Sequence, residues 1–335
     1  MSQRLRTAVI GLGHMGRHHA RIYAGLPGVQ LVACIDTDPS KAEELAGKYR
    51  CAAGTRIDPF LGGVDAISVA VPTVYHEAVA GLLIEAGVAT LIEKPLAPDS
   101  AAARRLVEKA AKRGCTLAVG HSERFNPVVL ALQRMQVAPK FIETHRISPF
   151  TFRSADIGVV FDMMIHDIDI VLHLVGERAY RASGVGVNVL GDHEDIANAR
   201  IEFASGAVAN LTASRLALKT ERKIRVFSPD AYLSMDFQKK SGIAIKKDAN
   251  LNLLKLARER NFEDLSQMQG VDFGKMVNVE PLQIDDVEPL RAEIEAFLHS
   301  ARTGARPAVP AEDGLAAVEM AEAIVASIRA HDWNG

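Results

Sequence analysis

The sequence predicts an α/β domain with a doubly wound parallel sheet, followed by an α+β domain with an open, mainly antiparallel sheet. Short apolar runs alternate with helix-type segments through the first 120 residues, which is typical of a parallel sheet with helices on both faces. From Phe141 onward the apolar residues recur with a period of two, as in antiparallel strands with one buried face. A chain of 335 residues is long enough for two separate cores. We therefore expect one domain over residues 1–122 and a second over residues 123–335.

The first strand, residues 7–10, leads into a glycine-rich turn and then into helix-type sequence. The turn reads GLGHMG over residues 11–16, which is the GxGxxG spacing in the strand, turn and helix context that dinucleotide binding requires. Its first glycine permits the tight turn, the second lets the backbone approach a pyrophosphate, and the third lets the helix pack closely on the strand. The helix start offers N–H groups and a positive dipole to the phosphates. The candidate cofactor-binding residues here are Gly11, Gly13, His14, Met15 and Gly16.

The second strand, residues 31–35, ends at Asp36, twenty residues past the last glycine of the turn. A carboxylate at this position accepts hydrogen bonds from the adenosine ribose hydroxyls of the cofactor. Asp38 adds a second negative charge, and no arginine follows that would hold a 2′-phosphate, so we predict NAD rather than NADP. The alternative role for Asp36 is to cap the helix that begins near Pro39, which is compatible with cofactor binding.

Two further strands bring polar residues to the same edge of the predicted sheet. They cover residues 66–71 and 90–92, and ligands of doubly wound sheets bind beyond the carboxyl ends of such strands. Lys94 follows an apolar strand and precedes a proline, so we expect it in the ligand crevice rather than on a solvated loop. The sequence leaves open whether Thr73 and His76 touch the nicotinamide or only shape the crevice. The cofactor candidates that follow these strands are Pro72, Thr73, His76, Glu93 and Lys94.

An apolar segment over residues 161–175 carries four ionisable groups at helical spacing. Asp162, His166, Asp169 and His173 fall at i, i+4, i+7 and i+11 of a predicted helix. Partly buried carboxylates and imidazoles are costly unless they are paired or take part in chemistry, so the stripe indicates either a satisfied core network or the wall of an active site. The last three groups are also an alternative zinc site. Because a metal needs three or four convergent ligands and a nicotinamide site would already account for the helix, we predict no metal.

The second half of the chain predicts a sheet with one apolar face. Helices follow around residues 290–298 and 315–328, and the last of them is a candidate for packing back on the first domain. A sheet covered on one side leaves a broad second face, and such faces commonly become subunit interfaces. We therefore expect a homodimer or a homotetramer that forms through this sheet. Residues 238–284 are less legible, and we interpret their lysines as a solvated face.

Composition argues against several other classes of protein. The 39 Lys and Arg residues balance 41 Asp and Glu residues, so the basic excess that binds nucleic acid is missing. The three cysteines are far apart and form no CxxC pair, which fits a reducing cytoplasm better than a disulfide framework or a thiolate zinc site. We see neither a signal peptide nor a stretch of about 18 apolar residues that would span a membrane. We expect a cytoplasmic protein.

Taken together, these residues resemble the glucose-fructose oxidoreductase, inositol dehydrogenase and MocA family over essentially the whole chain. The resemblance implies a Rossmann domain, a second domain with an open sheet, and a nicotinamide site served by a lysine and an Asp-x-x-x-His pair. Carried over by position, the catalytic residues are Lys94, Asp162 and His166, and the substrate side includes Arg124 and Asn126. The matching features are GLGHMG at residues 11–16, Asp36, Pro72, Thr73, His76, the Glu-Lys-Pro signature at residues 93–95, Arg124, Phe125, Asp162 and His166.

A finer resemblance concerns the substrate. Met164 stands where many relatives have glycine, two residues after the aspartate of the pair. With GHSERFNP at residues 120–127 and MIHDID at residues 164–169, the chain is similar to a subgroup that oxidises C3 of UDP-N-acetylglucosamine. Bidentate arginines are the expected clamps for such a nucleotide diphosphate sugar, while ordinary surface charge is the alternative. The further substrate candidates are Arg146, Arg153, Arg215 and, as a substrate contact or a supporting partner of the pair, Asp169.

The function we predict is the NAD-dependent oxidation of a secondary hydroxyl of a sugar, at C3 of a UDP-N-acetylhexosamine. His166 takes the hydroxyl proton, Asp162 orients the imidazole, and Lys94 stabilises the developing alkoxide, although the sequence allows Lys94 and His166 to exchange roles. One alternative is a dehydrogenase of a free sugar or of inositol. Another, from a different class, is a sensor that binds a dinucleotide without catalysing a reaction, and the presence of all three catalytic candidates argues against it.

Overall fold

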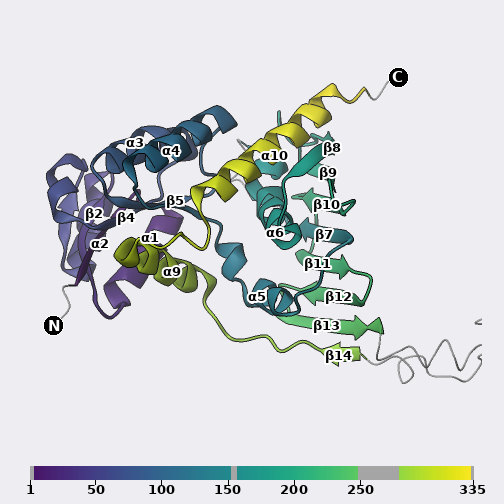
Figure 1. Cartoon of the computed structure of the whole chain (residues 1–335). Helices are drawn as coiled ribbons and strands as arrows, with labels where there is room; N and C mark the ends of the chain where they lie inside the picture. Colours follow the sequence, from purple (N-terminus) through teal and green to yellow (C-terminus); the bar gives the residue numbers. More distant parts are fainter. Residues whose placement is uncertain (1–3, 152–156, 248–278, 333–335) are drawn as a thin grey trace, which may run out of the picture. The chain divides into compact units, whose positions relative to one another are not determined.

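The computed structural model describes residues 4–151, 157–247 and 279–332 (Figure 1). Its contacts divide the chain into two compact units. The first unit comprises Met1–Phe125 and Val287–Glu322, and the second comprises Asn126–Asp286 and Ala323–Gly335. The chain thus leaves the first unit after Phe125, returns to it at Val287, and ends in the second unit. The predicted domain bounds, residues 1–122 and 123–335, remain a prediction.

The first unit contains a six-stranded sheet in which every neighbouring pair is parallel. This confirms the predicted doubly wound parallel sheet. The strand order reverses between β1 and β4, which is the switch point where such sheets bind ligands. In spatial order the strands are β3 (Ala52–Gly54), β2 (Val29–Ile35), β1 (Leu5–Ile10), β4 (Ala66–Val69), β5 (Ala89–Glu93) and β6 (Leu117–Gly120).

Helix α4 of the first unit begins and ends at recognisable capping residues. The Asp99 carboxylate accepts the N–H of Ala102 at the start of α4, and Gly114 ends that helix in the left-handed conformation. Three short 3-10 helices, η1 (Asp58–Gly63), η2 (Thr73–Tyr75) and η3 (Ser122–Phe125), lie between the longer elements. The α-helices are α1 (His14–Gly25), α2 (Pro39–Tyr49), α3 (His76–Glu85), α4 (Ser100–Arg113), α9 (Pro289–Thr303) and the first part of α10 (Ala311–Ala330).

A late helix completes the core of this unit. Ile294, Phe297 and Leu298 of α9 pack in one apolar cluster with Val9 of β1 and Leu31 of β2. Each such side chain contributes about 1.5–3 kcal/mol when it is fully buried. Helix α9 is therefore part of the core of the first unit, although it follows the whole second sheet in sequence.

The second unit contains an eight-stranded sheet, and its neighbouring strands are antiparallel except for the parallel pair β7 and β10. This confirms the open, mainly antiparallel sheet. A hairpin turn at Ser205 and Gly206 joins β9 to β10, and Gly206 adopts a φ of +80° that favours glycine. In spatial order the strands are β14 (Val279–Pro281), β13 (Ser241–Lys246), β12 (Ala231–Asp236), β11 (Glu221–Phe227), β7 (Phe141–Ile147), β10 (Val208–Ser214), β9 (Ile196–Phe203) and β8 (Ala179–Val187).

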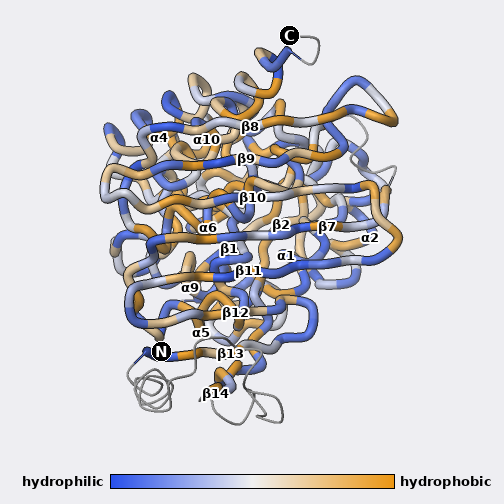
Figure 2. Tube along the Cα trace, turned by 90° about the vertical axis from the view of Figure 1, so that its right-hand side faces the viewer, coloured by the Kyte–Doolittle hydropathy of each residue, from blue (hydrophilic) through white to orange (hydrophobic). Residues whose placement is uncertain are grey.

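The two faces of this sheet differ in polarity, and hydrophilic and hydrophobic positions alternate along its strands (Figure 2). Helices α5 (Pro127–Arg134) and α6 (Ile165–Val175) contact the apolar face, and the end of α10 lies on β8, where Ser327 bonds the backbone of Gly184. The opposite face carries exposed or half-buried polar side chains: Glu143, His145, Asn198, Arg200, Glu202, Asn210, Thr212, Lys223 and Arg225. In the described part of the chain, no helix combines the length and the apolar character needed to cross a membrane.

Candidate active site

The glycine turn after β1 has a backbone that larger residues cannot adopt. Gly11 has a φ of +84°, and a Cβ there would lie 2.5 Å from the carbonyl oxygen of Ala70. A Cβ on Gly16 would lie only 1.8 Å from the carbonyl oxygen of Gly11. The first and third glycines of the motif are thus required by the packing of the turn against β4 and the helix.

Gly13 occupies a different environment from these two glycines. It is the N-cap residue of α1, and no side chain caps the start of this helix. No atom lies within 4 Å of the place where a Cβ on Gly13 would be. His14 begins the helix and is exposed, and Met15 is half-buried. Open space at the start of an uncapped helix is the cradle that a pyrophosphate needs, because the helix dipole and backbone N–H groups point to it. The turn therefore fits a dinucleotide.

Asp36 follows β2 and is bonded to the glycine turn. Its Oδ2 accepts the N–H of Leu12 at 2.7 Å, and its Oδ1 accepts the N–H of Asp38 at 2.9 Å. The cap of α2 is Asp38 instead, whose Oδ1 accepts the N–H of Ser40 at 3.0 Å. The alternative in which Asp36 only caps α2 is therefore wrong. Each oxygen of Asp36 still has lone-pair capacity for a ribose hydroxyl.

His76 connects two of the strand ends that border the crevice. Its Nδ1 lies 3.0 Å from the carbonyl oxygen of Pro95, and its Nε2 lies 3.0 Å from that of Val71. The ring is 1% exposed, and burial lowers the pKa of His76 even though the nearby carbonyl groups oppose this. This geometry favours a role in shaping the crevice. Pro72 precedes η2, and Thr73 begins it and is half-buried.

The three catalytic candidates are divided between the two units. Lys94 directly follows β5 in the first unit and is half-buried. Asp162 and His166 belong to the second unit and are half-buried as well. A half-buried position suits a catalytic group, because it is partly desolvated and still accessible to a ligand.

Asp162 lies on a π-helical turn, Val160–Met164, that leads directly into α6. The N–H of Asp162 donates to the carbonyl of Gly158 at 3.0 Å. Such π turns inside helices are frequent at functional sites. Because a π turn holds more residues than an α turn, the regular spacing that the sequence predicts for the four ionisable groups does not continue through it. Asp169 is 1% exposed, whereas His173 is exposed and lines a cavity of 200 Å³ between α5 and α6.

Two of the substrate-side arginines are buried in ion pairs. Arg146 donates to both oxygens of Asp167, at 3.1 and 2.8 Å, and both side chains are about 5% exposed or less. Arg215 donates to Oδ1 of Asp195 at 2.6 Å and to the carbonyl of Ile157 at 2.7 Å. These contacts favour structural roles for both arginines. Sequence reasoning missed the two aspartates, because partners so far apart in the chain leave no local pattern.

The remaining substrate candidates also have defined contacts where the structure describes them. Arg124 is 5% exposed and pairs with Asp313 at 2.8 Å, within the first unit. Asn126 begins α5, where its Oδ1 accepts the N–H of Val128 at 3.0 Å. Arg153 lies outside the described residues. Asn126 is accordingly a helix cap as well as a candidate for contacting substrate.

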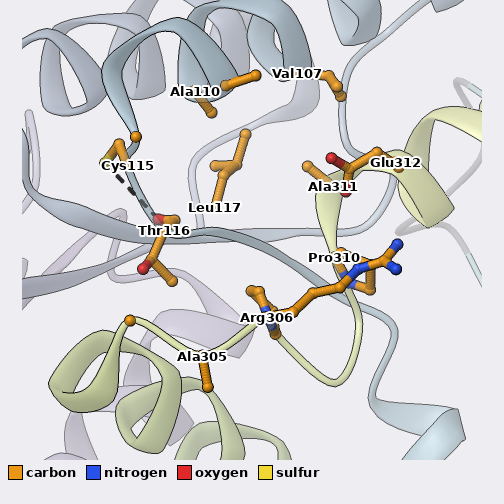
Figure 3. A pocket seen from close by; sticks show the side chains of 14 residues that line it. Val107, Ala110, Cys115, Thr116, Leu117, Ala305, Arg306, Pro310, Ala311 and Glu312 are labelled. Carbon is orange, nitrogen blue, oxygen red and sulfur yellow. Dashed lines mark hydrogen bonds between the residues drawn. The ribbon is translucent and has the colours of Figure 1, made fainter.

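A separate cavity of 280 Å³ lies in the first unit between the end of α4, the start of β6 and the connection from α9 to α10 (Figure 3). Cys115, Leu117 and Arg306 are among its lining residues. It lies at the amino end of β6, whereas the glycine turn and Lys94 follow the carboxyl ends of parallel strands. The cavity is therefore at the opposite edge of the sheet from the cofactor crevice.

A doubly wound sheet with an open glycine cradle at its switch point and Asp36 at the end of the next strand defines a dinucleotide-binding protein. The comparisons with known proteins give the particular class. Residues 5–121 match the model of the oxidoreductase family with an NAD-binding Rossmann fold, and residues 151–333 match that family's C-terminal α/β domain. The chain belongs to this family of glucose-fructose oxidoreductases, inositol dehydrogenases and MocA proteins, and it is an NAD-dependent oxidoreductase.

Several relatives have names that state an activity. The chain is 42% identical to a UDP-N-acetylglucosamine 3-dehydrogenase of Acidithiobacillus ferrooxidans over 70% of its own length and 74% of the relative. A solved structure of the enzyme of that name from the same organism has a TM-score of 0.86 and 34% identity, covering 98% of both chains. An inositol 2-dehydrogenase of Rhizobium meliloti is 25% identical over 97% of both chains. The predicted family and its oxidoreductase activity are confirmed.

Proposed function

We propose that this protein oxidises the C3 hydroxyl of a UDP-N-acetylhexosamine to a ketone with NAD as the hydride acceptor. The observation that carries the proposal is its similarity to the UDP-N-acetylglucosamine 3-dehydrogenase of A. ferrooxidans, which extends over 98% of the chain at a TM-score of 0.86. The glycine cradle, Asp36, Lys94, Asp162 and His166 supply the groups that this reaction needs.

The residues that would hold NAD belong to the first unit. Gly13 and the start of α1 receive the pyrophosphate, and Asp36 receives the adenosine ribose. His76 keeps the strand ends at Val71 and Pro95 in place beside the cofactor. When bound, NAD accepts a hydride from the carbon that carries the hydroxyl.

The protein's own residues manage the proton and the developing charge. His166 takes the hydroxyl proton on an imidazole nitrogen, and Asp162 orients that imidazole and stabilises its charge. Lys94 donates a hydrogen bond to the oxygen as it becomes an alkoxide. In a second version of the mechanism Lys94 takes the proton and His166 stabilises the oxygen. Either assignment uses general acid–base chemistry, which typically contributes about 10²–10⁴-fold to the rate.

For the substrate side we propose a reduced set of candidates. Asn126 and Arg153 remain candidates to contact the nucleotide sugar, and Asp169, which is buried on α6 beside the catalytic pair, supports that pair instead. We leave Arg124, Arg146 and Arg215 out of the substrate contacts, because aspartates already bind their guanidinium groups.

We also propose that the protein assembles as a homodimer or homotetramer through the polar face of its eight-stranded sheet. That face carries both signs of charge, with Arg225 and Glu143 paired at 3.1 Å, and it spans eight strands without a covering helix among the described residues. Self-association of a single face produces a two-fold interface. The three cysteines are free thiols, which supports our proposal that the enzyme works in the cytoplasm.

A second candidate function is the oxidation of inositol or of a free sugar. It is favoured by the inositol 2-dehydrogenase of R. meliloti, which matches 97% of the chain at 25% identity. The two functions differ in whether the substrate carries a diphosphate, and one assay separates them.

The test is product analysis with purified full-length protein. The protein is incubated with NAD and, in separate reactions, UDP-N-acetylglucosamine, UDP-N-acetylgalactosamine, N-acetylglucosamine and myo-inositol. We expect a UDP-sugar product that is lighter by two hydrogen atoms in mass spectrometry, together with reduced nicotinamide. Oxidation of inositol or of the free sugar alone would refute the proposed substrate, and an absence of oxidation across the whole panel would favour a dinucleotide sensor.

A further inference from the structure

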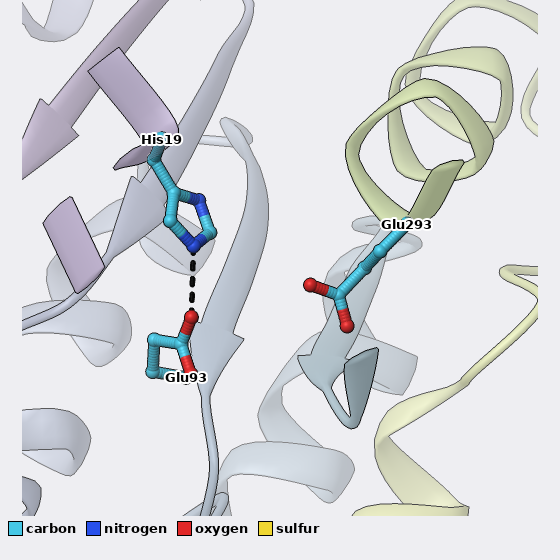
Figure 4. A group of neighbouring side chains, drawn as sticks. All are labelled: His19, Glu93 and Glu293. Atoms are coloured by element: carbon cyan, nitrogen blue, oxygen red, sulfur yellow. Dashed lines mark hydrogen bonds and ion pairs between the residues drawn. The ribbon is translucent and has the colours of Figure 1, made fainter. Parts of the chain in front are cut away.

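His19 lies on α1 within a buried polar network and is not one of the predicted cofactor-binding residues. Its ring is fully buried and bonded on both sides, to Ser68 of β4 and to Glu93 at the end of β5. Glu293 of α9 directs its carboxylate toward this pair (Figure 4), and ligand atoms of His19, Glu93 and Glu293 all lie within 4.8 Å of one another. Glu93 directly precedes Lys94 in the sequence.

The hydrogen bonds form one continuous chain, which we name the His19 network: Tyr23, Ser68, His19 and Glu93. Tyr23 Oη lies 2.7 Å from Ser68 Oγ, which lies 2.9 Å from His19 Nδ1, and His19 Nε2 lies 2.8 Å from Glu93 Oε1. An ionised carboxylate only accepts hydrogen bonds, so the neutral imidazole tautomer that fits this chain has its proton on Nε2, toward Glu93, and accepts from the Ser68 hydroxyl at Nδ1. Burial raises the pKa of Tyr23, so its hydroxyl stays protonated as the donor at the far end.

The same contacts argue against a metal ion at this cluster. A metal-binding imidazole needs a nitrogen lone pair directed at the ion, and both ring nitrogens of His19 are already within hydrogen-bond distance of protein oxygens. A chain of mutually bonded groups instead fixes the orientation of each member. The network is therefore suited to holding a side chain in place.

The side chain that the His19 network holds is that of Glu93, which directly precedes Lys94. On one side of Lys94, His19 binds the Glu93 side chain, and on the other side His76 lies 3.0 Å from the carbonyl of Pro95. Both histidines are 1% exposed or less, so their hydrogen bonds are shielded from water. Two buried imidazoles, one on α1 and one on α3, thus bracket a single lysine.

We propose that His19 is a positioning residue that, through Glu93, holds the Lys94 turn in its reactive arrangement, with His76 as the second holding point. The inference rests on the proposed role of Lys94 in the reaction. Displacing a catalytic group by about 1 Å costs about 100-fold in rate, so a residue that never touches substrate has a kinetic effect of that order.

The first experiment compares three variants of the full-length protein. His19→Leu should lower kcat by about 10- to 100-fold while the Kd for NAD stays within about twofold. His19→Gln keeps an amide N–H that can reach Glu93 and should recover a large part of kcat. The matched control is Thr90→Val on β5, the strand that also carries Glu93. It removes a buried hydroxyl that donates to the Val88 carbonyl, and it should leave kcat within about twofold of the wild type.

A second readout does not depend on the sugar. The rate at which acetic anhydride labels Lys94, relative to the exposed Lys112, is measured by mass spectrometry in wild type and in His19→Leu. We expect a clear change in the relative rate. If the wild type oxidises no sugar, the proposed function fails, while a changed labelling rate still supports the positioning role.

Two results would overturn the inference. One is a His19→Leu protein with wild-type kcat and wild-type labelling of Lys94, because the network would then contribute only to folding. The other is one equivalent of zinc in the purified protein, measured by elemental analysis, that is lost in Glu293→Gln. That result would make the cluster a metal site.

Discussion

The glycine turn of the first unit and the buried arginines of the second unit both place polar groups beside an apolar core, but they do so by different means. The turn is fixed by the backbone itself, since Gly11 and Gly16 stand where any side chain would collide with a carbonyl group. Arg146 and Arg215 are fixed by Asp167 and Asp195, which come from other elements. Steric rules therefore govern the first region, and long-range charge pairing governs the second.

The consequence is that the two regions respond differently to substitution. In the turn, neighbouring glycines have separate tasks, because Gly16 is enclosed and Gly13 faces open space. In the sheet of the second unit, a charge is tolerated in the core only because its partner is present.

Gly16→Ala should destabilise the protein by about 4 kcal/mol or more, because the new Cβ would lie 1.8 Å from the carbonyl oxygen of Gly11. Gly13→Ala is the matched control, since its Cβ meets nothing within 4 Å. That variant should keep its melting temperature within about 2 °C and lose about tenfold in NAD affinity. Calorimetry and NAD titration of both variants are the measurements. Equal loss of stability in the two would contradict the separate tasks of these glycines.

The glycine turn was more predictable from sequence than the buried arginines, because local backbone and steric requirements fix it. A strand, three glycines at fixed spacing and a following helix are local, so the turn and the parallel sheet could be predicted, and so could Asp36 at the end of the next strand. The return of α9 to the first core could not, because the apolar face of Phe297 and Leu298 does not reveal which sheet it will cover.

In the second region the residue types predicted substrate contacts for Arg146 and Arg215, and only the fold shows the aspartates that pair with them. Arg146 lies at an alternating position of β7 that faces the packed side of the sheet, and only the fold shows that Asp167 of α6 meets it there. The π turn at Asp162 could not be predicted either, because prediction from the sequence assumed regular α-helical spacing. Asp162 and His166 were singled out by an excess of ionisable groups in an apolar segment, which is a local signal.

Arg146→Ala should lower the free energy of unfolding by about 3–5 kcal/mol, because Asp167 is left as a buried charge without this partner. The double variant Arg146→Met/Asp167→Leu should recover most of the loss, since it removes both charges from the core. Urea unfolding of the two variants measures this. If Arg146 instead binds substrate, the double variant will be stable but will show a greatly increased KM for the UDP-sugar.

Acid should weaken the second unit through Asp195. Burial raises the pKa of this carboxyl, but the N–H groups of Leu190 and Val189 and the Arg215 guanidinium outweigh it, so the pKa lies below its usual value. A carboxyl with a lowered pKa in the folded state stabilises the protein above its unfolded pKa of about 3.9, and this stabilisation is lost as the pH falls through the folded value.

The measurement is the free energy of unfolding of wild type and Asp195→Asn between about pH 6 and pH 3. The difference between the two proteins should be largest at the upper end of this range and should shrink toward the lower end. A difference that is constant with pH would show that the charge of Asp195 does not contribute.

Lys94 is the residue that the proposed reaction requires and that the His19 network is proposed to hold in place. In Lys94→Met the side chain keeps most of its length and loses its charge. With UDP-N-acetylglucosamine and NAD, we expect kcat to fall by at least about 100-fold while the Kd for NAD stays within about threefold of the wild type. An unchanged kcat in this variant would contradict the proposed reaction, because it would remove Lys94 from the chemistry.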